Sequence, residues 1–109
     1  MNIFARTNPV QMNYRFTIIV PVYNEEDNLE RVEKELLNYI TIAKVPTKIL
    51  FVNDGSKDKS QEFIEQICDR NEAFQYICFG TNRGLSAAIK AGFDYVDTEL
   101  LGYIDSDLQ

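Results

Sequence analysis

Short apolar runs recur along the chain and are separated by stretches with helical spacing. Residues 16–20 and 49–52 are short, mainly apolar runs, the first rich in β-branched side chains. A run without alternation predicts a strand that is covered on both faces, as in a parallel sheet. Residues 74–79 and 100–104 are the third and fourth predicted strands.

Three amphipathic stretches lie between these strands and predict helices over residues 29–40, 59–71 and 85–96. The first has an apolar stripe and acidic residues in its first turns, where negative charge complements the helix dipole. Small residues in the third allow it to approach a neighbouring element closely. Leu85, Ile89, Phe93 and Val96 share one face of this predicted helix.

The element order β-α-β-α-β-α-β predicts an α/β fold. Such alternation favours a three-layer α/β/α arrangement around a mostly parallel sheet, like a Rossmann-type nucleotide-binding half. The 109 residues fit one compact domain. We assign this domain to residues 15–109 and expect residues 1–14, which contain Pro9, to form a flexible leader.

Composition and charge narrow the choice of ligand. The chain has 11 Lys and Arg against 17 Asp and Glu, a net charge of −6, which argues against a nucleic-acid partner. If so acidic a protein binds a phosphorylated ligand, a divalent cation is the simplest link between them. Without histidine, Cys68 and Cys78 make no zinc site, and we interpret them as reduced core thiols, which suits the cytosol.

Polar residues follow each predicted strand, at the edge of a parallel sheet where ligands bind. These segments are residues 21–25, 53–56, 82–84 and 105–107. Three of them place carboxylates on the same rim, despite the mutual repulsion. Clustered carboxylates of this kind need a cation or hydrogen-bond donors.

Each segment alone allows two readings. Asp105 and Asp107 suit Mg²⁺ or Mn²⁺, but a bare Asp-x-Asp is also an ordinary polar turn. Asp54 follows a buried strand and can accept a hydrogen bond from a nucleotide base, yet Asp-Gly is also a common turn. The Arg83 guanidinium can pair with a phosphate or with neighbouring acids.

Taken in order, the four segments resemble the family 2 glycosyltransferases, which have the GT-A fold. The resemblance covers residues 16–109, nearly the whole chain, and only the combination of segments is specific. It rests on Val20-Pro21-Val22-Tyr23-Asn24-Glu25-Glu26, Val52-Asn53-Asp54-Gly55-Ser56, Asn82-Arg83-Gly84 and Asp105-Ser106-Asp107-Leu108-Gln109. The final Leu-Gln and the small-residue helix look most like the branch that includes dolichyl-phosphate mannosyltransferase.

The resemblance implies an inverting transfer of sugar from a UDP- or GDP-linked donor, within cell-envelope polysaccharide synthesis. The acceptor it implies is a polyprenyl phosphate, which places the intact protein in the cytoplasm at the membrane face. The implied nucleotide-binding residues are Pro21, Val22, Tyr23, Glu25, Asp54, Arg83, Gly84 and Asp105, and the implied ligands of Mg²⁺ or Mn²⁺ are Asp107 and Asp105.

The resemblance also implies that something is missing. The family's acceptor site and catalytic base follow the Asp-x-Asp motif, so we expect no catalytic residue in this chain, a truncated donor-binding part that is inactive alone. We also expect self-association through an exposed sheet edge. The alternative is a non-enzymatic nucleotide-binding or signalling module. A dinucleotide-binding domain is disfavoured, because residues 21–24 replace its glycine-rich loop.

Overall fold

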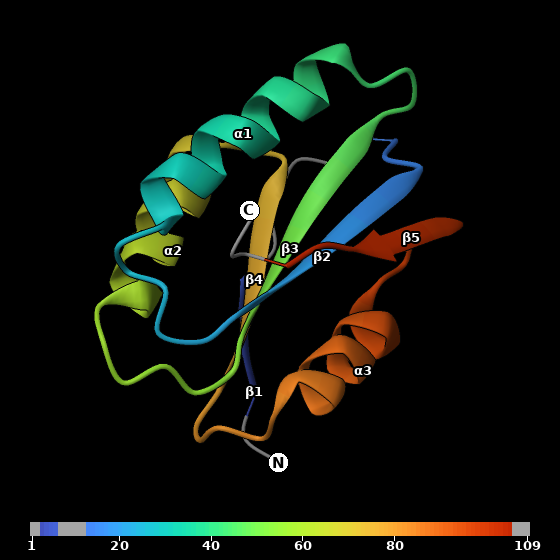
Figure 1. Cartoon of the computed structure of the whole chain (residues 1–109). Coiled ribbons are helices and arrows are strands. Elements are labelled where there is room, and N and C mark those ends of the chain that lie inside the picture. Colours follow the sequence, from blue (N-terminus) through green and yellow to red (C-terminus); the bar gives the residue numbers. More distant parts are fainter. Residues whose placement is uncertain (1–2, 7–12, 106–109) are drawn as a thin grey trace.

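The computed structural model describes residues 3–6 and 13–105, which form a five-stranded sheet with helices on both faces (Figure 1). The strands are β1 (Ile3–Arg6), β2 (Phe16–Val22), β3 (Thr47–Asn53), β4 (Phe74–Phe79) and β5 (Leu100–Tyr103). The helices are α1 (Leu29–Ile42), α2 (Ser60–Arg70) and α3 (Leu85–Tyr95). The predicted α/β class and the four predicted strands are confirmed.

The strand order is β1-β4-β3-β2-β5, and β2 lies between β3 and β5. Pairing is parallel from β4 to β5, with Ile18 of β2 opposite Ile49 of β3 and Gly102 of β5. The carboxyl ends of these four strands therefore point the same way. The polar segments that follow them are brought to one rim, as the sequence predicts.

Helices α1 and α2 cover one face of the sheet (Figure 1). The predicted stripe of α1 is buried at Leu29, Val32 and Leu36, which pack with Ile64 and Ile67 of α2. At about 25 cal/mol for each Å² of buried apolar surface, these side chains are the main stabilisation of this layer.

Helix α3 covers the opposite face and contacts it through small residues, as the sequence predicts. Ala88 and Gly92 are buried, whereas Leu85 and Phe93 are 60% and 43% exposed. The reason is close packing: a Cβ added to Gly92 would lie 2.7 Å from Cγ2 of Ile19 in β2. The small residues form the contact face because only they allow this approach.

The N-terminal segment also differs from expectation. Residues 3–6, assigned above to a flexible leader, form β1 and pair antiparallel with β4, with Ile3 opposite Phe79. Without this strand, one side of β4 would present unpaired backbone groups, and an antiparallel strand can satisfy them.

The two cysteines are free thiols: Cys68 is buried in α2 and Cys78 lies in β4. None of the helices in the part of the chain described here has the length and apolar character needed to span a bilayer.

Candidate functional site

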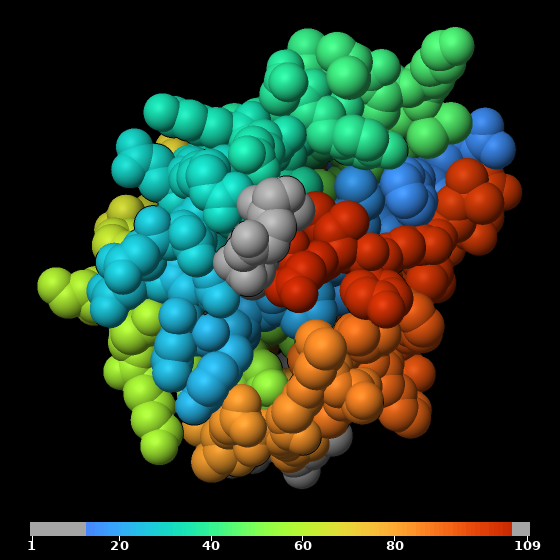
Figure 2. Space-filling view, viewed as in Figure 1, coloured from blue at the N-terminus to red at the C-terminus, as the bar shows by residue number. Residues whose placement is uncertain are grey.

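A pocket of about 240 Å³ lies at the carboxyl ends of β2, β3, β4 and β5. Figure 2 shows the blue, orange and red segments that follow β2, β4 and β5 meeting on one face of the molecule. The pocket is lined by Pro21, Val22, Tyr23, Glu25, Asp54, Asn82, Gly84, Leu85 and Asp105. Of the predicted nucleotide-binding residues, only Arg83 is not among them.

Pro21 and Val22 form the floor of this pocket from the end of β2. The strand continues through Val22, two residues beyond its predicted end, with Pro21 opposite Val52. Val22 also accepts a hydrogen bond from the backbone N–H of Asp54 at 2.8 Å. This bond fixes the end of β3 against the end of β2, so the two loops leave the sheet side by side.

Asp54 is buried, with 4% of its surface exposed, and organises the loop that follows β4. Its Oδ1 accepts the backbone N–H of Arg83 at 2.7 Å. Its Oδ2 accepts the backbone N–H of Gly84 at 2.9 Å and Nδ2 of Asn82 at 3.0 Å. All these donors are neutral, so none of them is a cationic partner for Asp54. A carboxylate oxygen accepts about two hydrogen bonds, so Oδ1 can accept one more from a ligand.

Gly55 allows these loops to touch. Its φ of +67° lies in the left-handed region, and a Cβ there would overlap the backbone of Thr81 and Asn82. Glycine alone avoids both the strain and the overlap. Gly55 thus brings the loop after β3 against the loop after β4, and Asp54 lines the pocket between them.

Arg83 contributes its backbone to the site rather than its side chain. The guanidinium carbon lies 5.0 Å from the centre of the Phe79 ring, in a cation–π contact, and Arg83 does not line the pocket. The two predicted partners of its guanidinium, a phosphate or neighbouring acids, stay predictions. Asn82 and Leu85 line the pocket instead, and the site prediction omitted both. Asn82 belongs to the Asn82-Arg83-Gly84 segment, but its partner Asp54 lies 28 residues away in the sequence.

Glu25 and Tyr23 stand at the mouth of the pocket. Tyr23 is 42% exposed, which leaves its ring available for stacking. Oε2 of Glu25 accepts a hydrogen bond from Nδ2 of Asn28 at 2.7 Å, which holds the carboxylate in place. Glu25 keeps acceptor capacity for ligand hydroxyls.

Asp105 completes the rim after β5. The backbone N–H of Ile104 bonds to the carbonyl oxygen of Ile19 at 3.0 Å, which extends the β2–β5 pairing almost to Asp105. Asp107, the other predicted metal ligand, lies outside the described residues. Among the residues that the structure does describe around this pocket, three are acidic and none is Lys or Arg. Carboxylate oxygens are the ligands that Mg²⁺ and Mn²⁺ prefer. Among the described residues, however, no three acidic or cysteine side chains are grouped closely enough to hold a metal ion.

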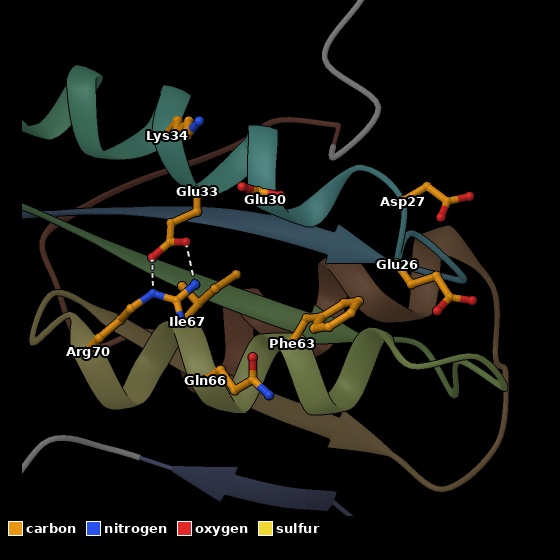
Figure 3. Close-up of a pocket in the computed structure, with 9 residues that line it drawn as sticks. All are labelled: Glu26, Asp27, Glu30, Glu33, Lys34, Phe63, Gln66, Ile67 and Arg70. Atoms are coloured by element: carbon orange, nitrogen blue, oxygen red, sulfur yellow. Dashed lines mark hydrogen bonds and ion pairs between the residues drawn. The ribbon is translucent and has the colours of Figure 1, made fainter.

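A larger hollow, of about 350 Å³, lies between α1 and α2 (Figure 3). Its buried carboxylate, Glu33, accepts Nε and a terminal nitrogen of Arg70 at 2.8 and 2.6 Å, and Nδ2 of Asn71 at 2.7 Å. The hydrogen bonds from Arg70 hold the pKa of Glu33 below its ordinary value, against the opposing effect of burial. Glu33 could not be predicted from the sequence, because its partners lie 37 and 38 residues away.

Comparison with known proteins places the chain among sugar-transferring enzymes. The model of the family described as "Glycosyl transferase family 2" matches residues 17–109. An uncharacterized glycosyltransferase of Synechocystis sp. is 38% identical over 98 residues, covering 90% of this chain and 31% of the relative. An undecaprenyl-phosphate 4-deoxy-4-formamido-L-arabinose transferase of Edwardsiella ictaluri is 31% identical, covering 85% of this chain and 29% of the relative.

A solved structure shares the fold. S. aureus TarS, residues 1–349, in complex with UDP-GlcNAc, has a TM-score of 0.68 and 25% identity to this chain. The match covers 85% of this chain and 26% of that one. The chain thus spans about three tenths of the length of the relatives that it matches.

Proposed function

Because the chain belongs to glycosyltransferase family 2, we propose that it is the donor-binding part of an inverting enzyme. That enzyme transfers a sugar from a nucleoside-diphosphate sugar to an acceptor. The observation that carries the proposal is the pocket at the four strand ends. Three acidic side chains line it, and its described lining includes no basic side chain. The chain is only part of the length of its relatives, so the proposal for this chain is donor binding.

In this proposal the nucleoside lies against the segments that follow β2 and β3. Asp54 is buried beside the pocket and accepts a base N–H with the remaining capacity of Oδ1. Tyr23 packs on the nucleoside, and Glu25 accepts from the ribose hydroxyls. A uridine or a guanosine base offers the N–H donor that this carboxylate requires, and the bound UDP-GlcNAc in the TarS structure favours uridine.

The diphosphate lies at Asp105, with a divalent cation held by Asp105 and Asp107. An acidic pocket repels a diphosphate unless a cation stands between them, and the described lining supplies no cationic side chain. In this proposal Asp105 and Asp107 would hold Mg²⁺ or Mn²⁺, which would supply positive charge to the diphosphate and to the departing nucleotide. The protein holds the nucleoside end of the donor in place.

We further propose a polyprenyl phosphate as the acceptor of the intact enzyme. Support comes from the relative named as an undecaprenyl-phosphate transferase, at 31% identity. Such an acceptor would bring the enzyme to a membrane surface. The described residues include no side chain to which we assign the role of catalytic base.

The open edge of the sheet supports a proposal of self-association with a second copy of the chain. β5 pairs only with β2 among the strands described, and Leu100, Leu101 and Tyr103 are 47%, 42% and 56% exposed. An apolar groove of about 310 Å³ lies beside it, between α1 and β5. An exposed strand edge next to apolar surface recruits another strand.

Titration calorimetry with UDP and with GDP, with and without Mn²⁺, tests donor binding. We expect one of the two nucleotides to bind in the presence of the metal and to bind far more weakly without it. Asp107→Ala should remove most of the metal-dependent part, and Asp94→Ala, an exposed acid on α3, is the matched control. Equal binding by wild type and Asp107→Ala would refute the metal assignment, and no binding of either nucleotide would refute donor binding.

A further inference from the structure

The loop after β2 and the loop after β3 are joined by side chains that bond to each other's backbone. Three successive amides of the first loop, at residues 24, 25 and 26, each donate to a side chain of the second. The acceptors are Oγ of Ser56 at 2.9 Å, Oγ of Ser60 at 2.8 Å and Oδ2 of Asp58 at 3.2 Å. A fourth bond runs the other way, from the backbone N–H of Lys57 to the side chain of Asn24. We call these four hydrogen bonds the interloop clasp.

Asn24 closes the clasp from the opposite side. Its Oδ1 accepts the backbone N–H of Lys57 at 2.8 Å, so Asn24 both donates to the second loop and accepts from it. Its φ of +52° is in the left-handed region, which asparagine tolerates better than most residues. The residue is exposed and does not line the rim pocket. Its side chain therefore acts on the loop and not on a ligand.

The second loop is itself held rigid. Ser56 donates its hydroxyl to Oδ1 of Asn53 at 2.6 Å, and the N–H of Ser60 bonds to Oδ1 of Asp58 at 2.8 Å. Burial raises the pKa of Asp58, but the hydrogen bonds from Ser60 and from the Glu26 backbone outweigh it, and the net pKa is lowered. Asp58 is thus a charged acceptor for both loops over the neutral pH range.

The clasp brackets the two residues that face the nucleoside in our proposed function. Tyr23 directly precedes the three bonded amides, and the amide of Glu25 is the middle one. We propose that Asn24 is a positioning residue, which with Ser56 and Ser60 holds Tyr23 and Glu25 in the geometry that receives the nucleoside. This inference rests on the proposed function and adds that the interloop clasp sets the affinity for the nucleotide.

The size of the effect follows from population. A loop released from the clasp samples several conformations, and the apparent affinity falls by the fraction that remains competent. Loss of one hydrogen bond of about 1 kcal/mol lowers that fraction roughly fivefold. Asn24→Gly keeps access to the left-handed backbone but removes the acceptor, whereas Asn24→Asp keeps an acceptor of the same shape.

The test compares nucleotide affinity with stability in four variants of the 109-residue chain. UDP or GDP, whichever wild type binds, is titrated with Mn²⁺ into Asn24→Gly, Asn24→Asp, Ser56→Ala and Ser56→Thr. We expect about fivefold weaker binding in the Gly and Ala variants and recovery to within about twofold in the Asp and Thr variants. Arg70→Gln, which loosens α1 against α2 away from the rim, is the control for general destabilisation and should leave affinity unchanged.

Amide hydrogen exchange shows whether a variant opens the clasp locally or destabilises the chain as a whole. The amide of Lys57 loses its acceptor in Asn24→Gly, and the amide of Asn24 loses its acceptor in Ser56→Ala. These and the other clasp amides should exchange faster while those of β3 stay protected. If wild type binds and both variants bind equally well with these amides released, the positioning role is refuted but donor binding stands. If wild type binds neither nucleotide, the proposed function fails and this inference with it.

Discussion

The buried carboxylates Asp54 and Glu33 differ in the charge of their partners. Both are nearly inaccessible, at 4% and 6% exposure, and each accepts three side-chain or backbone hydrogen bonds from the loop or helix opposite. Glu33 meets the guanidinium of Arg70, and its charge is neutralised within the seam between α1 and α2. In the described part of the chain, Asp54 meets only neutral donors.

This difference separates a stabilising site from a binding site. A carboxylate paired with a cation holds two elements together and has little left to offer a ligand. A carboxylate held by backbone dipoles keeps its charge and a defined orientation, and it lies beside Glu25 and Asp105. The larger cavity is therefore the structural one, and the smaller cavity at the strand ends is the candidate site.

Asp54→Ala should have the largest effect, because it damages the fold and the site together. The backbone N–H groups of Arg83 and Gly84 lose their acceptor, at a cost of about 1–3 kcal/mol for donors that are partly buried. Nucleotide affinity should fall by more than about tenfold, since a loss of about 1.4 kcal/mol in binding free energy already gives that factor. Urea unfolding and calorimetry measure the two effects. Nucleotide binding that survives unchanged would show that the rim is not the site.

Arg70→Ala should affect stability alone. It leaves Glu33 charged and buried with Asn71 as its remaining partner, and it should cost about 1–2 kcal/mol. This lies below the loss for a fully buried pair because the Arg70 side chain is 53% exposed. Nucleotide affinity should be unchanged. A parallel loss of affinity would mean that the seam and the rim are coupled.

Stability at low pH provides a smaller, graded test. The folded pKa of Glu33 is lowered from its ordinary value of 4.5, so its contribution is complete above that pH. As the pH falls through the folded pKa, the carboxylate is protonated and the contribution is lost. Glu33→Gln removes this titration. Thermal unfolding from pH 6 to pH 3 should therefore change less in the variant than in wild type, and parallel curves would exclude Glu33 as the source.

The smallest effect on the folded chain should come from Leu101→Lys on β5. A charge on an exposed edge strand opposes pairing with another chain and costs the monomer little. Light scattering over a range of concentrations should show larger species for wild type than for the variant. A wild type that stays monomeric at high concentration would end the proposal of self-association.

The sequence was sufficient for the fold class because the determining patterns are local. Apolar runs and helical stripes lie within single elements, and the predicted span of β4 matches the structure at both ends. The segments at the strand ends could be placed on one rim because parallel strands all end at the same edge. These inferences required only the order of the elements.

What the sequence could not supply were contacts between distant residues. The side chain of Arg83 turned out to lie over Phe79, and Asp54 turned out to hold residues 82–84, contacts set by the packing of two loops. The small residues of α3 predicted a close approach, but that Gly92 lies against Ile19 is again a contact between distant residues. The strand at residues 3–6 depends on the edge of β4, which is 68 or more positions away in the sequence.

Paramagnetic NMR tests most directly whether the metal and the nucleotide bind at the rim or in the larger hollow between α1 and α2. The uniformly ¹⁵N-labelled chain is titrated with small amounts of Mn²⁺ in the presence of UDP or GDP. We predict selective broadening of the amide signals of Tyr23, Gly84 and Asp105, with those of Glu30 and Gln66 unaffected. Broadening centred on Glu30 and Gln66, with the rim signals sharp, would contradict the assignment of the site.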